Sequence, residues 1–173
     1  MRCIKTIPYP ELRLDTTIEM TASFKDYTVQ NQTPMNISIK LLADQPHRIG
    51  AVGELRWREW GDTTQPDTLD RWVQISEEEA GYERLPVTWV VVDAHGQVVG
   101  AIGLPEFEIE EARDRSTWVV SVIEAAHQRS TGIAGQLMAV LEVFAHFSTY
   151  SQLWVATGVR AVTFYQKCGC KLS

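Results

Sequence analysis

The chain has 173 residues, of which 45% are hydrophobic and 22% charged, and its formal net charge at pH 7 is −6. This length suits a single globular domain, and the apolar fraction excludes a disordered chain. No apolar run approaches the roughly 20 residues that cross a bilayer, and a nucleic-acid binder needs a basic face that the charge balance argues against. We therefore expect neither membrane nor nucleic-acid partners, while an acidic surface favours cationic partners such as amines.

The three cysteines bear on compartment and metal binding. Cys3, Cys168 and Cys170 are odd in number, and two of them are one residue apart, so they form no disulfide framework. Free thiols in a reducing cytosol account for them. No second Cys/His cluster lies nearby in the sequence to complete a metal site, and the first residues lack the apolar core of a secretion signal. We expect a cytoplasmic protein without a metal.

Residues 1–35 differ from the rest of the chain. They are rich in Thr, Tyr and Pro and show only weak alternation. We interpret them as an N-terminal extension, either a flexible arm or one or two short strands docked on the core. Residues 36–173 form the predicted domain.

From residue 36 onward the hydrophobic pattern alternates between strand and helix periods. It predicts strands over 36–42, 87–93, 98–104, 118–124 and 153–156, and helices over 46–60, 65–80, 132–147 and 160–167. Glycines end the first two helices, and a tight turn at 94–97 makes a hairpin of the second and third strands. This order predicts an α/β (α+β) fold with a mixed, mostly antiparallel central sheet.

The loop between the strand at 118–124 and the long helix carries the most specific chemistry. It reads Arg-Ser-Thr-Gly-Ile-Ala over residues 129–134. Unpaired N–H groups and the helix dipole make such a helix start an anion site, and small residues let a phosphate approach the backbone. An ordinary strand-turn-helix connection is the alternative. The pattern matches neither the phosphate loop of nucleotide hydrolases nor the dinucleotide fingerprint.

Several segments together resemble the GCN5-related N-acetyltransferase (GNAT) family, in particular its bacterial small-molecule amine branch. The loop at 129–134 resembles the family's Arg/Gln-x-x-Gly-x-Gly/Ala motif. Residues 51–61, 97–104 and 160–169 resemble its first helix, third strand and Phe-Tyr helix, in the family's order. The resemblance covers about 36–173. It implies a three-layer α-β-α fold and transfer of an acetyl group from acetyl-CoA to an amine.

The resemblance also implies roles for individual residues. The cofactor pyrophosphate would contact the main chain of the loop, and the pantetheine arm would pair with the strand end before it. Tyr165 matches the tyrosine that protonates the departing thiolate, and Glu124 and Glu106 are the carboxylates that we consider as base. The cofactor set is Val122, Ile123, Glu124, Arg129, Ser130, Thr131, Gly132, Ile133 and Ala134. The resemblance implies that the acceptor is a small amine, or the N-terminal or lysine amine of a peptide, and that it attacks directly in a ternary complex.

Two departures from the family pattern matter. Glu124 replaces an apolar residue, and the chain stops four residues after Gly169, where family members continue with two more strands. We expect the last strands to be missing and the strand at 153–156 to have an open edge, unless the N-terminal extension covers it. An open edge favours association, so a homodimer is one expectation. A non-catalytic acyl-CoA-binding or protein-interaction member and an inactive fragment are the alternatives.

Overall fold

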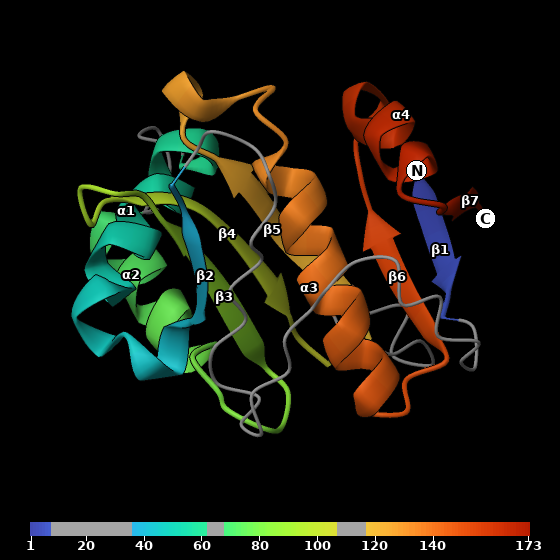
Figure 1. Cartoon of the computed structure of the whole chain (residues 1–173), viewed down its shortest axis with the longest axis horizontal. Coiled ribbons are helices and arrows are strands. Elements are labelled where there is room, and N and C mark those ends of the chain that lie inside the picture. Colours follow the sequence, from blue (N-terminus) through green and yellow to red (C-terminus); the bar gives the residue numbers. More distant parts are fainter. Residues whose placement is uncertain (8–35, 62–67, 107–116) are drawn as a thin grey trace.

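The computed structural model describes residues 1–7, 36–61, 68–106 and 117–173. One mixed sheet and four α-helices make up the described chain (Figure 1). In chain order the elements are β1 (Arg2–Thr6), β2 (Ser38–Leu41), α1 (Ile49–Trp60), α2 (Leu69–Glu78), β3 (Val87–Val92), β4 (Val98–Leu104), β5 (Trp118–Glu124), α3 (Ile133–Phe147), β6 (Gln152–Ala156), α4 (Val159–Lys167) and β7 (Lys171–Leu172). The predicted α/β fold is confirmed, and the elements from residue 36 follow the predicted order, with one correction: the two-residue β7 follows α4, where no strand was expected.

The sheet has the strand order β2-β3-β4-β5-β6-β1-β7. Every neighbouring pair is antiparallel except β5 and β6, which run parallel. These two strands pair only where Trp118 faces Trp154 and Val119 faces Val155. Beyond this point they separate, as Figure 1 shows, and the sheet divides into two halves.

The edge of β6 that faces away from β5 is covered by the N-terminal strand. β1 pairs antiparallel with β6 from Arg2–Ala156 to Thr6–Gln152, and the two-residue β7 pairs with the far side of β1. The alternative in which the N-terminal extension covers this edge is therefore confirmed. Residues 8–35 lie outside the described residues, so the proposed domain division at residue 35 stays a prediction.

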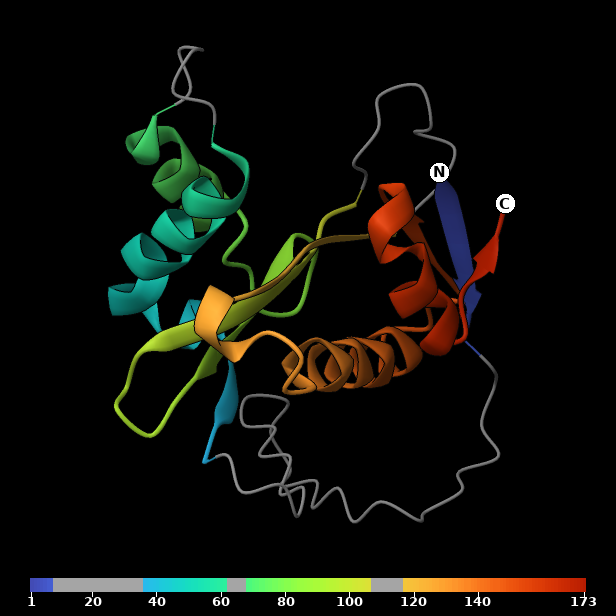
Figure 2. The same cartoon turned by 90° about the horizontal axis from the view of Figure 1, so that it is seen from above.

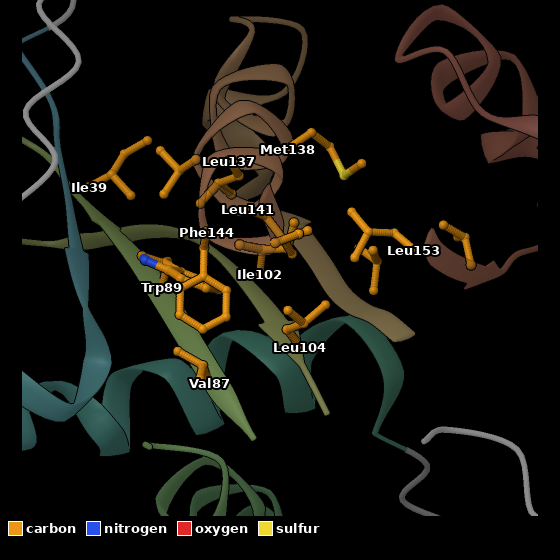
Figure 3. Close-up of a cluster of buried hydrophobic side chains, with 14 of the residues drawn as sticks. Ile39, Val87, Trp89, Ile102, Leu104, Leu137, Met138, Leu141, Phe144 and Leu153 are labelled. Carbon is orange, nitrogen blue, oxygen red and sulfur yellow. The ribbon is translucent and has the colours of Figure 1, made fainter. Parts of the chain in front are cut away.

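Two helical layers enclose the sheet. α1 and α2 lie on one face and α3 lies on the other (Figure 2). Against α3 pack Trp89 and Ile102, and the Trp89 and Phe144 rings meet edge to face at 5.0 Å (Figure 3). Val90 and Val92, on the opposite face of β3, pack with Val52 of α1. Because both faces of β3 are covered, all six of its residues are buried.

This packing fixes the positions of β4 and β5, the two strands on which the candidate site is built. Burying each large apolar side chain stabilises the fold by roughly 1.5–3 kcal/mol relative to exposure.

Within the described ranges, no helix is long and apolar enough to cross a membrane.

Candidate active site

The separation of β5 from β6 leaves main-chain groups of β5 without a neighbouring strand on that side. The strand also carries a bulge: the register with β4 shifts between Ala101 and Gly103, and Ser121 has a φ of 53°. A non-glycine residue in the left-handed region is uncommon and marks a special local geometry. The bulge bends β5, and an extended ligand chain can pair with the free edge as a strand would.

A cleft of about 730 Å³ opens at this separation. The C-terminal end of α1 and one side of α2 form one wall, β5 forms the floor, and α4 with the residues before it forms the other wall. The lining residues include Glu59, Trp60, Trp72, Ile75, Glu79, Ser121, Gly158 and Tyr165. Both charged residues of the described lining are acidic, and each pairs with an arginine that lies outside the lining.

The predicted anion loop has the backbone geometry that its sequence requires. Gly132 is the N-cap of α3 with a φ of 91°, and Ser130 also has a positive φ of 65°. Gly132 has no side chain that could block a ligand from the loop. The space around it is open, since a Cβ built there would meet nothing within 4 Å. The first-turn N–H groups of α3 therefore point to a surface that a phosphate can approach.

Glu124 lies at this loop. Its Oε1 accepts a hydrogen bond of 2.7 Å from the main-chain N–H of Ala134, in the first turn of α3. A carboxylate at a helix N-terminus is stabilised by the helix dipole. Glu124 lines a second cleft, of about 650 Å³, whereas Tyr165 lines the first. The structure does not bring these two predicted catalytic residues together.

The remaining predicted polar residues are distributed around the two clefts. Arg129, in the loop, forms an ion pair with Glu59 of α1, with Nη2 and Oε2 2.5 Å apart. Glu106 follows β4, is exposed, and lines neither cleft. Its sequence neighbours at 107–116, including Glu108, lie outside the described residues.

Tyr165 is buried on α4, with 7% of its surface exposed, and reaches the cleft. Its ring meets Phe164 edge to face at 5.1 Å. Burial, followed by the nearby thiols of Cys170, Cys168 and Cys3, raises the pKa of Tyr165 above its ordinary value. The hydroxyl is therefore protonated throughout the neutral range and is available as a proton donor.

Sequence reasoning missed one charged pair in the cleft wall. Arg56 of α1 has no exposed surface, and its Nη1 lies 2.9 Å from Oε2 of Glu79, at the end of α2. The available signal was helical spacing: Arg56 stands four residues after the buried Val52 and four before Trp60, on the apolar stripe of α1. A charge at such a position needs a buried partner.

Comparison with known proteins identifies the family. The chain belongs to the acetyltransferase (GNAT) family, whose model matches residues 49–170. The resemblance predicted from the sequence motifs is therefore confirmed. Membership supports acetyl-CoA-dependent acetyltransferase activity. A search of curated proteins found no match.

Solved structures share the fold at low sequence identity. An acetyltransferase from Trypanosoma brucei has a TM-score of 0.59 and 16% identity, covering 80% of this chain and 94% of that one. Glucosamine-6-phosphate N-acetyltransferase from Arabidopsis thaliana has a TM-score of 0.57 and 15% identity, covering 80% and 93%. An aminoglycoside N-acetyltransferase in complex with CoA has a TM-score of 0.60 and 15% identity, covering 80% and 87%.

Proposed function

We propose that this protein transfers the acetyl group of acetyl-CoA to a primary amine by direct attack in a ternary complex. The observation that carries the proposal is the cleft where β5 leaves β6, on a strand whose far end leads through the loop to the open helix start at Gly132. In a GNAT family member, this arrangement provides both a phosphate site and an extended slot that ends in a pocket.

The residues present fit acetyl-CoA. The loop with Gly132 and the first turn of α3 would hold the pyrophosphate through main-chain N–H groups, assisted by Arg129. The free edge of β5 from Val122 to Glu124 would pair with the amide groups of the pantetheine arm. When bound, acetyl-CoA supplies an activated thioester. The carboxylate of Glu124 and the pyrophosphate would contact the same N–H group, so Glu124 must move aside for the cofactor.

The reaction requires a neutral amine and a protonated leaving group. The ammonium form of the acceptor first loses one proton to free the lone pair that forms the C–N bond to the acetyl carbonyl carbon. The same nitrogen loses a second proton as the C–S bond breaks and the amide forms, and both protons pass to solvent. Tyr165 donates its proton to the departing sulfur and recovers one from solvent, so that one proton is released for each ammonium acetylated. The raised pKa of Tyr165 keeps this donor protonated between turnovers.

A second candidate is a member that binds acyl-CoA without turnover. The placement of Glu124 and Tyr165 in different clefts favours this candidate, because the predicted base then stands apart from the predicted acid. The two candidates differ in whether an amine consumes bound acetyl-CoA.

Thiol release from acetyl-CoA in the presence of primary amines tests the proposal. We expect release with the wild type and a fall in kcat of about a hundredfold in Tyr165→Phe, the typical contribution of a general acid. Tyr82→Phe is the matched control, because Tyr82 is exposed, binds the Ala43 carbonyl oxygen and lies outside the cleft. An unchanged rate in Tyr165→Phe would contradict the acid role. Binding of acetyl-CoA without thiol release would favour the non-catalytic candidate.

A further inference from the structure

The ion pair between Arg56 and Glu79 lies in the wall of the cleft that α1 and α2 form. Arg56 comes from α1 and Glu79 caps the C-terminal end of α2. The same guanidinium donates a hydrogen bond of 3.2 Å to Ser76 Oγ. Two helices are therefore joined by one charged cluster, and only Glu79 of this cluster lines the cleft.

The cluster is a costly arrangement for the fold to maintain. Arg56 is fully buried, and its Nε and Nη2 have no hydrogen-bond partner. A buried guanidinium requires a counter-charge, and Glu79 supplies it. Arg56 therefore fixes the position of the Glu79 carboxylate.

Glu79 retains capacity to bind a second cation. Its side chain is 21% exposed and lines the cleft, whereas its Oε2 is buried against Arg56, so a cation in the cleft would contact Oε1. A carboxylate has about four acceptor positions, so one cation does not saturate it. The open side of Glu79 faces the cleft, where the reacting amine must enter.

Two tryptophans stand on the same wall. The rings of Trp60 and Trp72 are stacked with centroids 6.2 Å apart and planes inclined by 29°, and both line the cleft. Trp60 is 44% exposed, which is unusual for so large an apolar side chain and marks a surface that a ligand can cover. Tryptophan faces attract cations and pack against apolar groups.

We propose that Glu79, positioned by Arg56, binds the acceptor as its ammonium ion, and that Trp60 and Trp72 hold an apolar or aromatic body attached to that ammonium. This inference rests on the proposed function and names its substrate class: an amine with one cationic group and an apolar body. No basic side chain lines the cleft among the described residues, so an acceptor with a carboxylate or phosphate beside its amine would find no counter-charge there.

The experiment compares two ligands of the same shape. Calorimetric titration of the CoA-saturated protein with 2-phenylethylamine and with the uncharged 2-phenylethanol measures the preference for the ammonium. We expect the amine to bind at least about tenfold more tightly, as a charge-assisted contact with a carboxylate implies. Glu79→Gln should remove this preference and leave the affinity for the alcohol unchanged.

The controls separate binding from folding. Glu78→Gln removes the neighbouring carboxylate, which is 55% exposed, binds Arg71 and Gln74, and lies outside the cleft; it should keep the full preference. Glu79→Gln leaves the buried Arg56 without a counter-charge, so the paired variant Arg56→Met with Glu79→Gln removes both charges together. We expect the paired variant to lose the preference as well.

The outcomes distinguish failure of this inference from failure of the proposed function. If both Glu79 variants keep the ammonium preference, the role of Glu79 is wrong. If thiol release occurs with spermidine or glutamate but 2-phenylethylamine neither binds nor reacts, the proposed function stands and the substrate class is wrong. If acetyl-CoA binds but none of these three amines causes thiol release, the proposed function itself fails.

Discussion

The carboxylate of Glu124 accepts a hydrogen bond from the N–H group to which we assign the cofactor pyrophosphate. A carboxylate in this place satisfies one of the free donors of the helix start and gains from the helix dipole. It also places a negative charge beside the expected position of two phosphates. The carboxylate of Glu124 and the cofactor pyrophosphate therefore compete for the same main-chain N–H group.

We therefore expect Glu124→Gln to bind acetyl-CoA more tightly than the wild type, by about threefold to tenfold, because a like charge is removed from the phosphate site. Calorimetric titration measures the change. Glu78→Gln, which removes an exposed carboxylate from α2, should leave the affinity as it is. A weaker affinity in Glu124→Gln would show that the carboxylate supports cofactor binding.

Tyr165 and Cys170 predict a loss of stability at alkaline pH. Burial is the main cause that raises the pKa of Tyr165 and raises that of Cys170 to about 11. The folded state thus keeps protons that the unfolded chain releases. The stability that these groups contribute is fully present below their ordinary pKa values and is lost as the pH rises from those values through the raised pKa values of the folded state. The thermal midpoint should fall from about pH 8.5 upward. Cys170→Ala and Tyr165→Phe should each flatten that fall; an equally steep decline in both would contradict the assignment.

At the scale of elements, the start of α3 depends on a left-handed glycine. Gly132 has a φ of 91°, which costs residues with a Cβ roughly 1–2 kcal/mol. Gly132→Ala should therefore destabilise the protein by about that amount and weaken acetyl-CoA binding. Gly135→Ala is the matched control: it lies inside α3 with open space around its Cβ, and alanine there should stabilise by roughly 0.5–1 kcal/mol. Chemical denaturation measures both changes.

β1 is a structural strand of the sheet, flanked by β6 and β7. Lys5 ties it to α3 through Glu142, at 2.5 Å, and donates a hydrogen bond to the Cys168 carbonyl oxygen beside α4. Ile4→Pro should destabilise the protein by about 3 kcal/mol or more, because proline removes a ladder hydrogen bond in a central strand. Ile4→Val keeps the strand and should cost far less. Equal unfolding midpoints for the two variants would show that β1 contributes little to the sheet.

The elements with strong local periodicity could be predicted from the sequence, and the contacts between distant segments could not. The repeat of apolar residues at 133, 137, 141 and 144 is contained in α3 itself. By contrast, the pairing of β1 with β6 joins residues about 150 positions apart, and weak alternation over five residues carries no information about its partner. Local pattern specifies the type of an element, while its neighbour depends on the packing of the whole chain.

The same limit explains which site residues were found. The residues of the loop at 129–134 are adjacent in the sequence and form one motif, so the position of the loop at a helix start could be predicted. Glu79 lies 23 residues after Arg56, and only the packing of α1 on α2 brings them together. The contact of Glu124 with Ala134 depends on how the intervening loop turns back on the strand. Spacing alone does not encode that turn.

At the scale of the whole molecule, the site exists because two half-sheets separate. α3 packs on the face of β3, β4 and β5 opposite to α1 and α2. The strands β1, β6 and β7 form the second half-sheet, together with α4. The cleft takes its floor from the first half, one wall from α1 and α2, and the other wall from α4. Cofactor and acceptor would therefore meet at the boundary between the two halves. The cofactor would bind along the free edge of β5, and the acceptor would bind against the wall formed by α1 and α2.

The proposed activity depends on a cofactor site that is formed by the helix start at Gly132 and the free edge of β5. Calorimetric titration of the 173-residue protein with desulfo-CoA tests it without any contribution from chemistry. We expect saturable binding at one ligand per chain, weakened in Gly132→Ala and unchanged in Gly135→Ala. Absence of binding by a folded sample would contradict it, and would mean that the chain keeps the GNAT fold without its cofactor site.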